Sequence, residues 1–142
     1  MIPHRKRAQS LLTRRGRNVH GELLIEGVRL VEDALEANVQ IQQIYSITVD
    51  SETRLAALIN KATNAGIPCT EVLPDELLSL SDTESPQGVV AIVTQPTWSI
   101  EDVFGRGTGD VLVLDAVRDP GNVGTLLRTA EAAGARGVIA LR

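Results

Sequence analysis

Short apolar runs alternate with amphipathic stretches over most of the chain. The runs have the length and the aliphatic composition of strands, and they cover residues 22–26, 41–49, 67–73 and 89–93. Between them, apolar residues recur at helical spacing, with Gly27 before the first helix and Asp50 or Ser51 as the cap of the second. A shorter helix is predicted to begin at Pro74. This alternation predicts an α/β domain of three layers, with helices on both faces of a sheet.

The two ends of the chain have different patterns. Residues 3–17 can form one helix in which Ala8 and Leu11 share a face. After residue 94, prolines and glycines predict a linker, and one strand–helix–strand unit follows it. The sequence is therefore divided into a basic N-terminal helix or arm, a domain, a linker and a β-α-β unit, at 1–20, 21–95, 96–109 and 110–142.

Composition narrows the class of protein. Hydrophobic residues make up 43% of the 142 residues, aromatic residues only 2%, and no apolar run has the ~18 residues of a membrane span. No secretory signal follows the basic N-terminus, so a cytoplasmic protein without membrane contact is expected. A single cysteine, Cys69, is expected in the core. We expect Trp98 to pack at the junction between the two parts rather than to stack on a base.

Charge is unevenly distributed. The net charge is -4, yet the first twenty residues have no acidic residue and contain six of the cations, Arg5, Lys6, Arg7, Arg14, Arg15 and Arg17. A basic arm on an acidic body favours contact with a polyanion, and a solubilising tail is the alternative. No metal site is expected, because His4 and His20 have no third ligand nearby.

The chemistry of the chain concentrates after residue 114. In the segment DPGNVG, two glycines allow a ligand close to the backbone and a helix N-terminus favours an anion, so a phosphate or carboxylate ligand is expected. Arg128 can reach over Gly124 and bind a phosphate diester. The alternatives are that Arg128 pairs with Glu131 and that Asn122 is only the N-cap of the helix.

The stretch LDAVRDPGNVGTLLRTAEAAG, residues 114–134, resembles the first signature motif of the SpoU (TrmH-like) branch of the SPOUT RNA methyltransferases. The core of that motif, N-x-G-x-x-x-R, corresponds to Asn122, Gly124 and Arg128. The stretches LLIEGVRLVEDAL and SDTESPQGVVAIV are similar to the substrate-binding domain that precedes the knotted domain in that family. The resemblance covers nearly the whole chain.

The resemblance implies an S-adenosylmethionine-dependent 2'-O-ribose methyltransferase that acts on ribosomal RNA, or on transfer RNA, as a homodimer. It implies the fold of ribosomal and kink-turn-binding proteins for residues 21–95 and an incomplete start of the knotted SPOUT domain for residues 110–142. Arg128 would engage the RNA and assist attack by the ribose hydroxyl, and Asn122 would position the substrate or the arginine. The basic arm and Arg29 become the expected RNA contacts.

The motifs that form the knot and hold the cofactor are expected beyond Arg142. The chain as given is therefore expected to be inactive and not to bind S-adenosylmethionine appreciably. Two alternatives remain open: a stand-alone RNA-binding module, in which the β-α-β unit serves for packing or dimerisation, and an α/β protein that binds a small phosphate compound.

Overall fold

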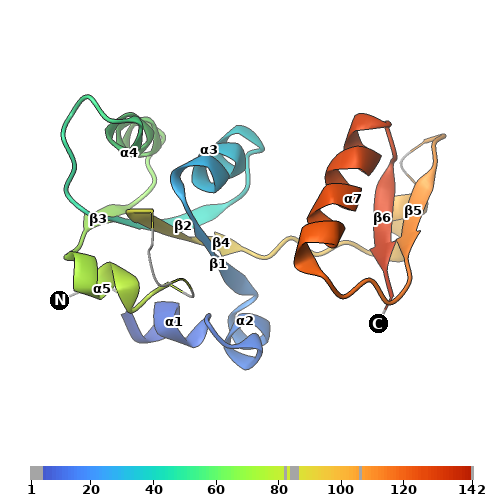
Figure 1. Cartoon of the computed structure of the whole chain (residues 1–142), viewed down its shortest axis with the longest axis horizontal. Helices are drawn as coiled ribbons and strands as arrows, with labels where there is room; N and C mark the ends of the chain where they lie inside the picture. Colours follow the sequence, from blue (N-terminus) through green and yellow to red (C-terminus); the bar gives the residue numbers. More distant parts are fainter. Residues whose placement is uncertain (1–4, 82, 84–86, 106, 142) are drawn as a thin grey trace. The chain divides into compact units, whose positions relative to one another are not determined.

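The computed structural model describes residues 5–81, 83, 87–105 and 107–141. Two compact units are formed, Met1–Pro96 and Thr97–Arg142 (Figure 1). His4 lies outside the described residues, as does part of the predicted loop at 81–88. Among the described residues, no helix is long and apolar enough to cross a membrane, and no group of three potential metal ligands is found.

The first unit is built on a four-stranded sheet of order β1-β4-β2-β3. The strands are β1 (Glu22–Glu26), β2 (Ile41–Ser46), β3 (Cys69–Glu71) and β4 (Val89–Thr94). β4 runs antiparallel to both β1 and β2, whereas β2 and β3 are parallel. The four predicted strands are present, but β2 ends at Ser46 rather than Val49. β3 is also shorter than predicted, in part because Pro68 has no N–H to donate to a neighbouring strand.

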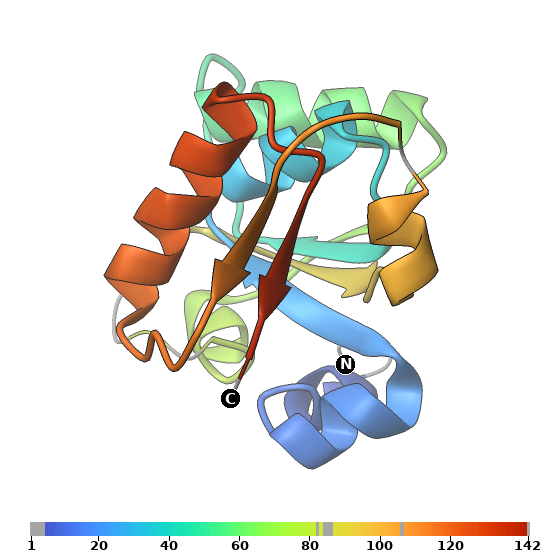
Figure 2. The same cartoon turned by 90° about the vertical axis from the view of Figure 1, so that its right-hand side faces the viewer.

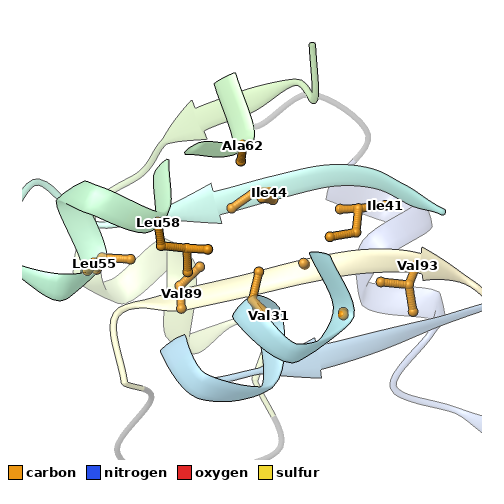
Figure 3. Close-up of a cluster of buried hydrophobic side chains, with 10 residues drawn as sticks. Val31, Ile41, Ile44, Leu55, Leu58, Ala62, Val89 and Val93 are labelled. Atoms are coloured by element: carbon orange, nitrogen blue, oxygen red, sulfur yellow. The ribbon is translucent and has the colours of Figure 1, made fainter. Parts of the chain in front are cut away.

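Helices α3 (Val28–Glu36) and α4 (Arg54–Asn64) cover one face of this sheet (Figures 1 and 3). Their apolar stripes meet the sheet in a cluster that includes Val31, Ile44 and Leu58, called here the α3–α4 cluster. Cys69 is half-buried against it. The predicted cap of the second helix is wrong: Thr53 precedes α4, and its Oγ1 accepts a 3.1 Å hydrogen bond from the Ala56 N–H. Threonine is a good cap, so the helix begins two or three residues later than predicted.

The opposite face is covered by α1 (Arg5–Ser10), α2 (Arg14–His20) and α5 (Pro74–Leu78). Ala8 and Leu11 are buried with Tyr45, Leu77 and Ile92 in a second cluster, the α1–α5 cluster. The basic arm is therefore folded into the core of the first unit, and the alternative of a solubilising tail is wrong.

The single helix predicted at residues 3–17 is also wrong, because the chain turns between α1 and α2. Thr13 Oγ1 accepts a 3.1 Å hydrogen bond from the Gly16 N–H and starts the second helix. The helices approach so closely that a Cβ atom at Gly16 would lie 1.9 Å from the Ser10 carbonyl oxygen. Only glycine fits at this crossing.

The second unit contains two parallel strands, β5 (Val111–Leu114) and β6 (Gly137–Ala140), joined through α7 (Pro120–Ala132). Helix α7 lies along the strand pair (Figure 2). The stretch predicted as a linker holds a short helix, α6 (Ile100–Phe104), which starts with a capping box: Ser99 and Asp102 each bind the backbone N–H of the other. Trp98 belongs to this unit and is 63% exposed.

Candidate functional site

The loop between β5 and α7 holds the start of the predicted site. Leu114 is the buried end of β5, and the chain leaves the strand through Asp115 and Ala116. Ala116 has φ 52°, in the left-handed region that L-residues with a Cβ rarely adopt. Nothing in the sequence predicts this strained alanine, because alanine is not a residue type that marks such a conformation.

Helix α7 is capped by Asp119, and the prediction of Asn122 as its N-cap is wrong. Asp119 Oδ1 accepts a 2.8 Å hydrogen bond from the Asn122 N–H, and Pro120 occupies the first helical position. An aspartate before a proline is itself a helix-start pattern, so the sequence contained the information needed to predict this cap. Asn122 lies in the first turn, and its exposed side chain makes no hydrogen bond to another described residue.

The Asp119 carboxylate changes the electrostatics of this helix end. A negative charge at the N-cap offsets the partial positive charge of the helix N-terminus and binds one of its free N–H groups. The helix end alone is therefore a weaker anion site than the glycines suggested. A cationic side chain is needed to hold a phosphate here.

Arg128 supplies that cation. A Cβ atom at Gly124 would lie 3.3 Å from Nη1 of Arg128, and Nη2 donates a 3.4 Å hydrogen bond to Thr125 Oγ1. The guanidinium thus lies over Gly124, turned back toward the start of α7, as the spacing predicts. No ion pair between described residues includes Arg128, so the alternative pair with Glu131 is not formed.

The basic residues of the first unit fall into two groups. Arg7 and Arg17 hold the fold together: Arg7 forms a bidentate ion pair with the buried Glu22, and Arg17 Nη1 donates 3.0 Å hydrogen bonds to the carbonyls of Leu11 and Leu12. The hydrogen bond to Glu22 raises the pKa of Arg7. Neither guanidinium is as available for a ligand as its sequence position suggested.

The remaining cations of α1 and α2 are exposed: Arg5, Lys6, Arg14 and Arg15. Arg5 makes one long hydrogen bond, 3.5 Å to Ser79 Oγ. We refer to these four residues as the basic patch. Arg29 is also exposed, but it lies on α3, on the opposite face of the sheet from α1 and α2 (Figure 1). The structure therefore does not bring all the predicted RNA-binding residues together.

Comparison with known proteins supports the sequence resemblance. Residues 3–91 match the family model of the MRM3-like substrate binding domain. The 23S rRNA (guanosine(2553)-2'-O)-methyltransferase RlmP of Bacillus subtilis is 35% identical over 131 residues, which is 92% of this chain and 48% of that protein. The mitochondrial rRNA methyltransferase 3B of Danio rerio is 33% identical over 122 residues, 83% of this chain and 26% of that protein.

Solved structures give the same result. An AdoMet-bound rRNA methyltransferase from Sinorhizobium meliloti superposes with a TM-score of 0.76 at 30% identity, over 97% of this chain and 51% of that one. The SpoU methyltransferase AviRb from Streptomyces viridochromogenes, in complex with AdoMet, also has a TM-score of 0.76, at 27% identity, over 99% of this chain and 53% of that one. The chain thus spans about half the length of these solved structures, and half or less of the two curated relatives.

Proposed function

We propose that this chain is part of an RNA 2'-O-ribose methyltransferase, because it belongs to the SpoU (TrmH-like) branch of the SPOUT methyltransferases and carries an MRM3-like substrate-binding domain. Its first unit recognises structured RNA, with ribosomal RNA as the preferred substrate and transfer RNA as the second candidate. This unit has a three-layer α/β/α fold of the kind found in ribosomal and kink-turn-binding proteins. Its second unit begins the knotted catalytic domain. The observation that carries the proposal is the Arg128 guanidinium, held over Gly124 without a carboxylate partner among the described residues.

Arg128 acts as an electrostatic anchor in this proposal. A guanidinium keeps its proton at physiological pH and is a poor general base, so we assign Arg128 to binding the RNA phosphate and the target hydroxyl. Asn122, with its side chain exposed in the first turn of α7, positions the substrate or the arginine. Any proton lost from the hydroxyl leaves to solvent or to a phosphate oxygen.

The methyl donor is S-adenosylmethionine, which supplies an electrophilic methyl group when bound. The described residues do not fit this cofactor: the groove of about 260 Å³ between β5 and α7 is lined by apolar residues, with Asp110 and Thr129 as its only polar members. A charged cofactor needs more polar partners than these. We therefore propose that the 142-residue chain alone is inactive. From the family resemblance we also propose that the whole protein works as a homodimer, and from the composition that it does so in the cytoplasm.

The RNA-binding part is tested with the chain itself. The affinity for a structured ribosomal RNA fragment is measured by fluorescence anisotropy at several salt concentrations. Replacing Lys6, Arg14 and Arg15 by Ala should weaken binding and lower the salt slope by about one for each phosphate contact removed. Lys61→Ala is the matched control, because Lys61 pairs with Glu36 on the opposite side of the unit. An unchanged slope in the triple variant contradicts the assignment of the basic patch.

The catalytic part is tested by cofactor binding and methyl transfer. Calorimetric titration of the chain with S-adenosylmethionine should detect no binding in the micromolar range. Micromolar binding would show that these residues do form the cofactor pocket. In the whole protein, Arg128→Ala should lower methyl transfer by about 10²–10³-fold. If that variant methylates normally, the role assigned to Arg128 is wrong. If the unchanged whole protein transfers no methyl group and Arg128→Ala leaves its RNA affinity unaltered, the stand-alone RNA-binding module becomes the better hypothesis.

A further inference from the structure

A second cavity lies in the second unit and shares no residue with the Arg128 site. It has a volume of about 180 Å³ and is lined by Trp98, Asp102, Val103, Arg136, Gly137 and Val138. These residues come from α6, from the chain just before it, and from the start of β6. Pockets for drug-sized ligands have ~300–1,000 Å³, so this cavity suits one small planar group.

Gly137 allows α6 to form the wall of this cavity. A Cβ atom at position 137 would lie 2.7 Å from Cγ1 of Val103, closer than any side chain tolerates. Val103 therefore packs directly on the backbone of β6. The capping box between Ser99 and Asp102 fixes the start of α6. This part of the segment that was predicted to be a linker therefore has a defined conformation.

Arg136 places a buried donor on the wall of the cavity. Its Nη1 donates hydrogen bonds of 3.3 Å to the Phe104 carbonyl and 2.5 Å to the Gly107 carbonyl, and the guanidinium lies 5.4 Å from the centre of the Phe104 ring. These contacts fix its orientation. Its Nε is buried and has no hydrogen-bond partner in the part of the chain that the structure describes. A buried donor without an acceptor is unfavourable, and such a group in a native protein is a place to look for a bound acceptor.

Trp98 supplies an aromatic surface beside that donor. Its side chain lines the cavity and is 63% exposed, although a tryptophan that served only packing would be covered. Single-stranded RNA is recognised by exposed aromatic rings on which bases stack, together with hydrogen bonds to base edges. The cavity offers an exposed indole and, on Arg136, a donor without an acceptor among the described residues; Asp102, which also lines it, binds Ser99 in the capping box.

We propose that this cavity binds one unpaired nucleobase of the RNA, stacked on Trp98 and accepting a hydrogen bond from Nε of Arg136. The inference rests on the proposed function, since it names a further contact to the same RNA. It adds a contact in the second unit that is separate from the basic patch of the first. This proposal assigns Trp98 to base stacking, whereas packing at the junction remains the expectation from the sequence.

Trp98 is the only tryptophan of the chain, so its fluorescence reports on the cavity directly. The 142-residue chain is titrated with uridine monophosphate, with adenosine monophosphate, with ribose 5-phosphate and with a short single-stranded RNA. Saturable quenching by the RNA and by at least one nucleotide is expected, with none by ribose 5-phosphate. Absence of quenching, or equal quenching by ribose 5-phosphate, overturns the proposal.

Variants separate stacking from structural effects. Trp98→Ala should weaken binding of the labelled single-stranded RNA by about tenfold, and Trp98→Phe should retain most of the affinity. Arg136→Lys, which removes the Nε donor but keeps the charge, should weaken it as well. Ile100→Ala is the control, because Ile100 is 57% exposed in the same segment but does not line the cavity. Circular dichroism verifies that each variant is folded.

The two proposals can fail independently. If the basic patch binds structured RNA with the expected salt slope while Trp98→Ala binds like the unchanged chain, the cavity proposal is wrong and the proposed function stands. If nucleotides quench Trp98 but the chain binds no structured RNA, the cavity binds bases and the proposed function is wrong.

Discussion

The two units differ in how much core their strands and helices bury. In the first, β4 is buried from Val89 to Val93, and apolar clusters form on both faces of the sheet. In the second, the only buried apolar residues of the described part are Leu114 and Ala130, while Val113 and Leu141 are about half exposed. Parallel strands are normally covered on both faces. The unit with the clearest sequence motif is therefore the one with the smaller core.

This difference shows that a motif and a core are separate properties of a sequence. The N-x-G-x-x-x-R motif lies at a loop and an exposed helix flank, where substitutions usually change stability little. The first unit, in contrast, is defined by many aliphatic residues, each of which could be exchanged for another of similar size. Three predictions test the comparison.

The largest expected effect comes from deleting core volume in each unit. Leu58 is 2% exposed in the α3–α4 cluster, and Leu58→Ala should lower the free energy of unfolding by about 2–5 kcal/mol. Val113 is 52% exposed, and Val113→Ala should change it by less than about 0.5 kcal/mol. Urea unfolding followed by circular dichroism measures both. Similar losses in the two variants would mean that the second unit has a core comparable to that of the first.

A smaller effect is expected where α1 and α2 cross. A methyl group at position 16 would collide with the Ser10 carbonyl, so Gly16→Ala should destabilise the first unit by about 1–3 kcal/mol. Asn18→Ala, on the exposed surface of the same helix, is the control and should leave the melting temperature nearly unchanged. If both variants melt alike, the basic helices are not an integral part of this unit.

The smallest effect is a dependence on alkaline pH that belongs to the first unit. Burial raises the pKa of Tyr45, and the charge of Arg7 offsets part of the rise. The folded protein thus keeps the phenolic proton to a higher pH than the unfolded chain, whose tyrosine has a pKa of about 10. The stability linked to this proton is complete below about pH 10 and is lost as the pH rises through the folded-state pKa.

Urea unfolding at several alkaline pH values should therefore give a steeper loss of stability for the unchanged chain than for Tyr45→Phe. Tyr45 is the only tyrosine, so its phenolate absorbance gives the pKa directly. Trp98 fluorescence, from the second unit, serves as the internal comparison. Parallel loss in both proteins would show that Tyr45 does not carry this dependence.

Much of the fold and of the site could be predicted from the sequence. The strands were predicted because aliphatic runs and helical stripes are local patterns, which persist whatever the chain contacts. The position of Arg128 over Gly124 followed from helical spacing alone, since residues four apart lie on one face. The motif also carried the resemblance to the SpoU branch, and the family model then matched residues 3–91 of the first unit.

The tertiary structure decided which of several possible partners each polar group takes. The sequence does not distinguish the six cations at the N-terminus from one another. In the fold, Arg7 pairs with Glu22 and Arg17 binds two carbonyls, because only the tertiary structure brings those groups together. Likewise, Asp119 rather than Asn122 caps α7, and Gly137 admits Val103 to form the cavity beside Trp98. Such pairings depend on distances between distant residues, whereas the strands and helices depend mainly on neighbours in sequence.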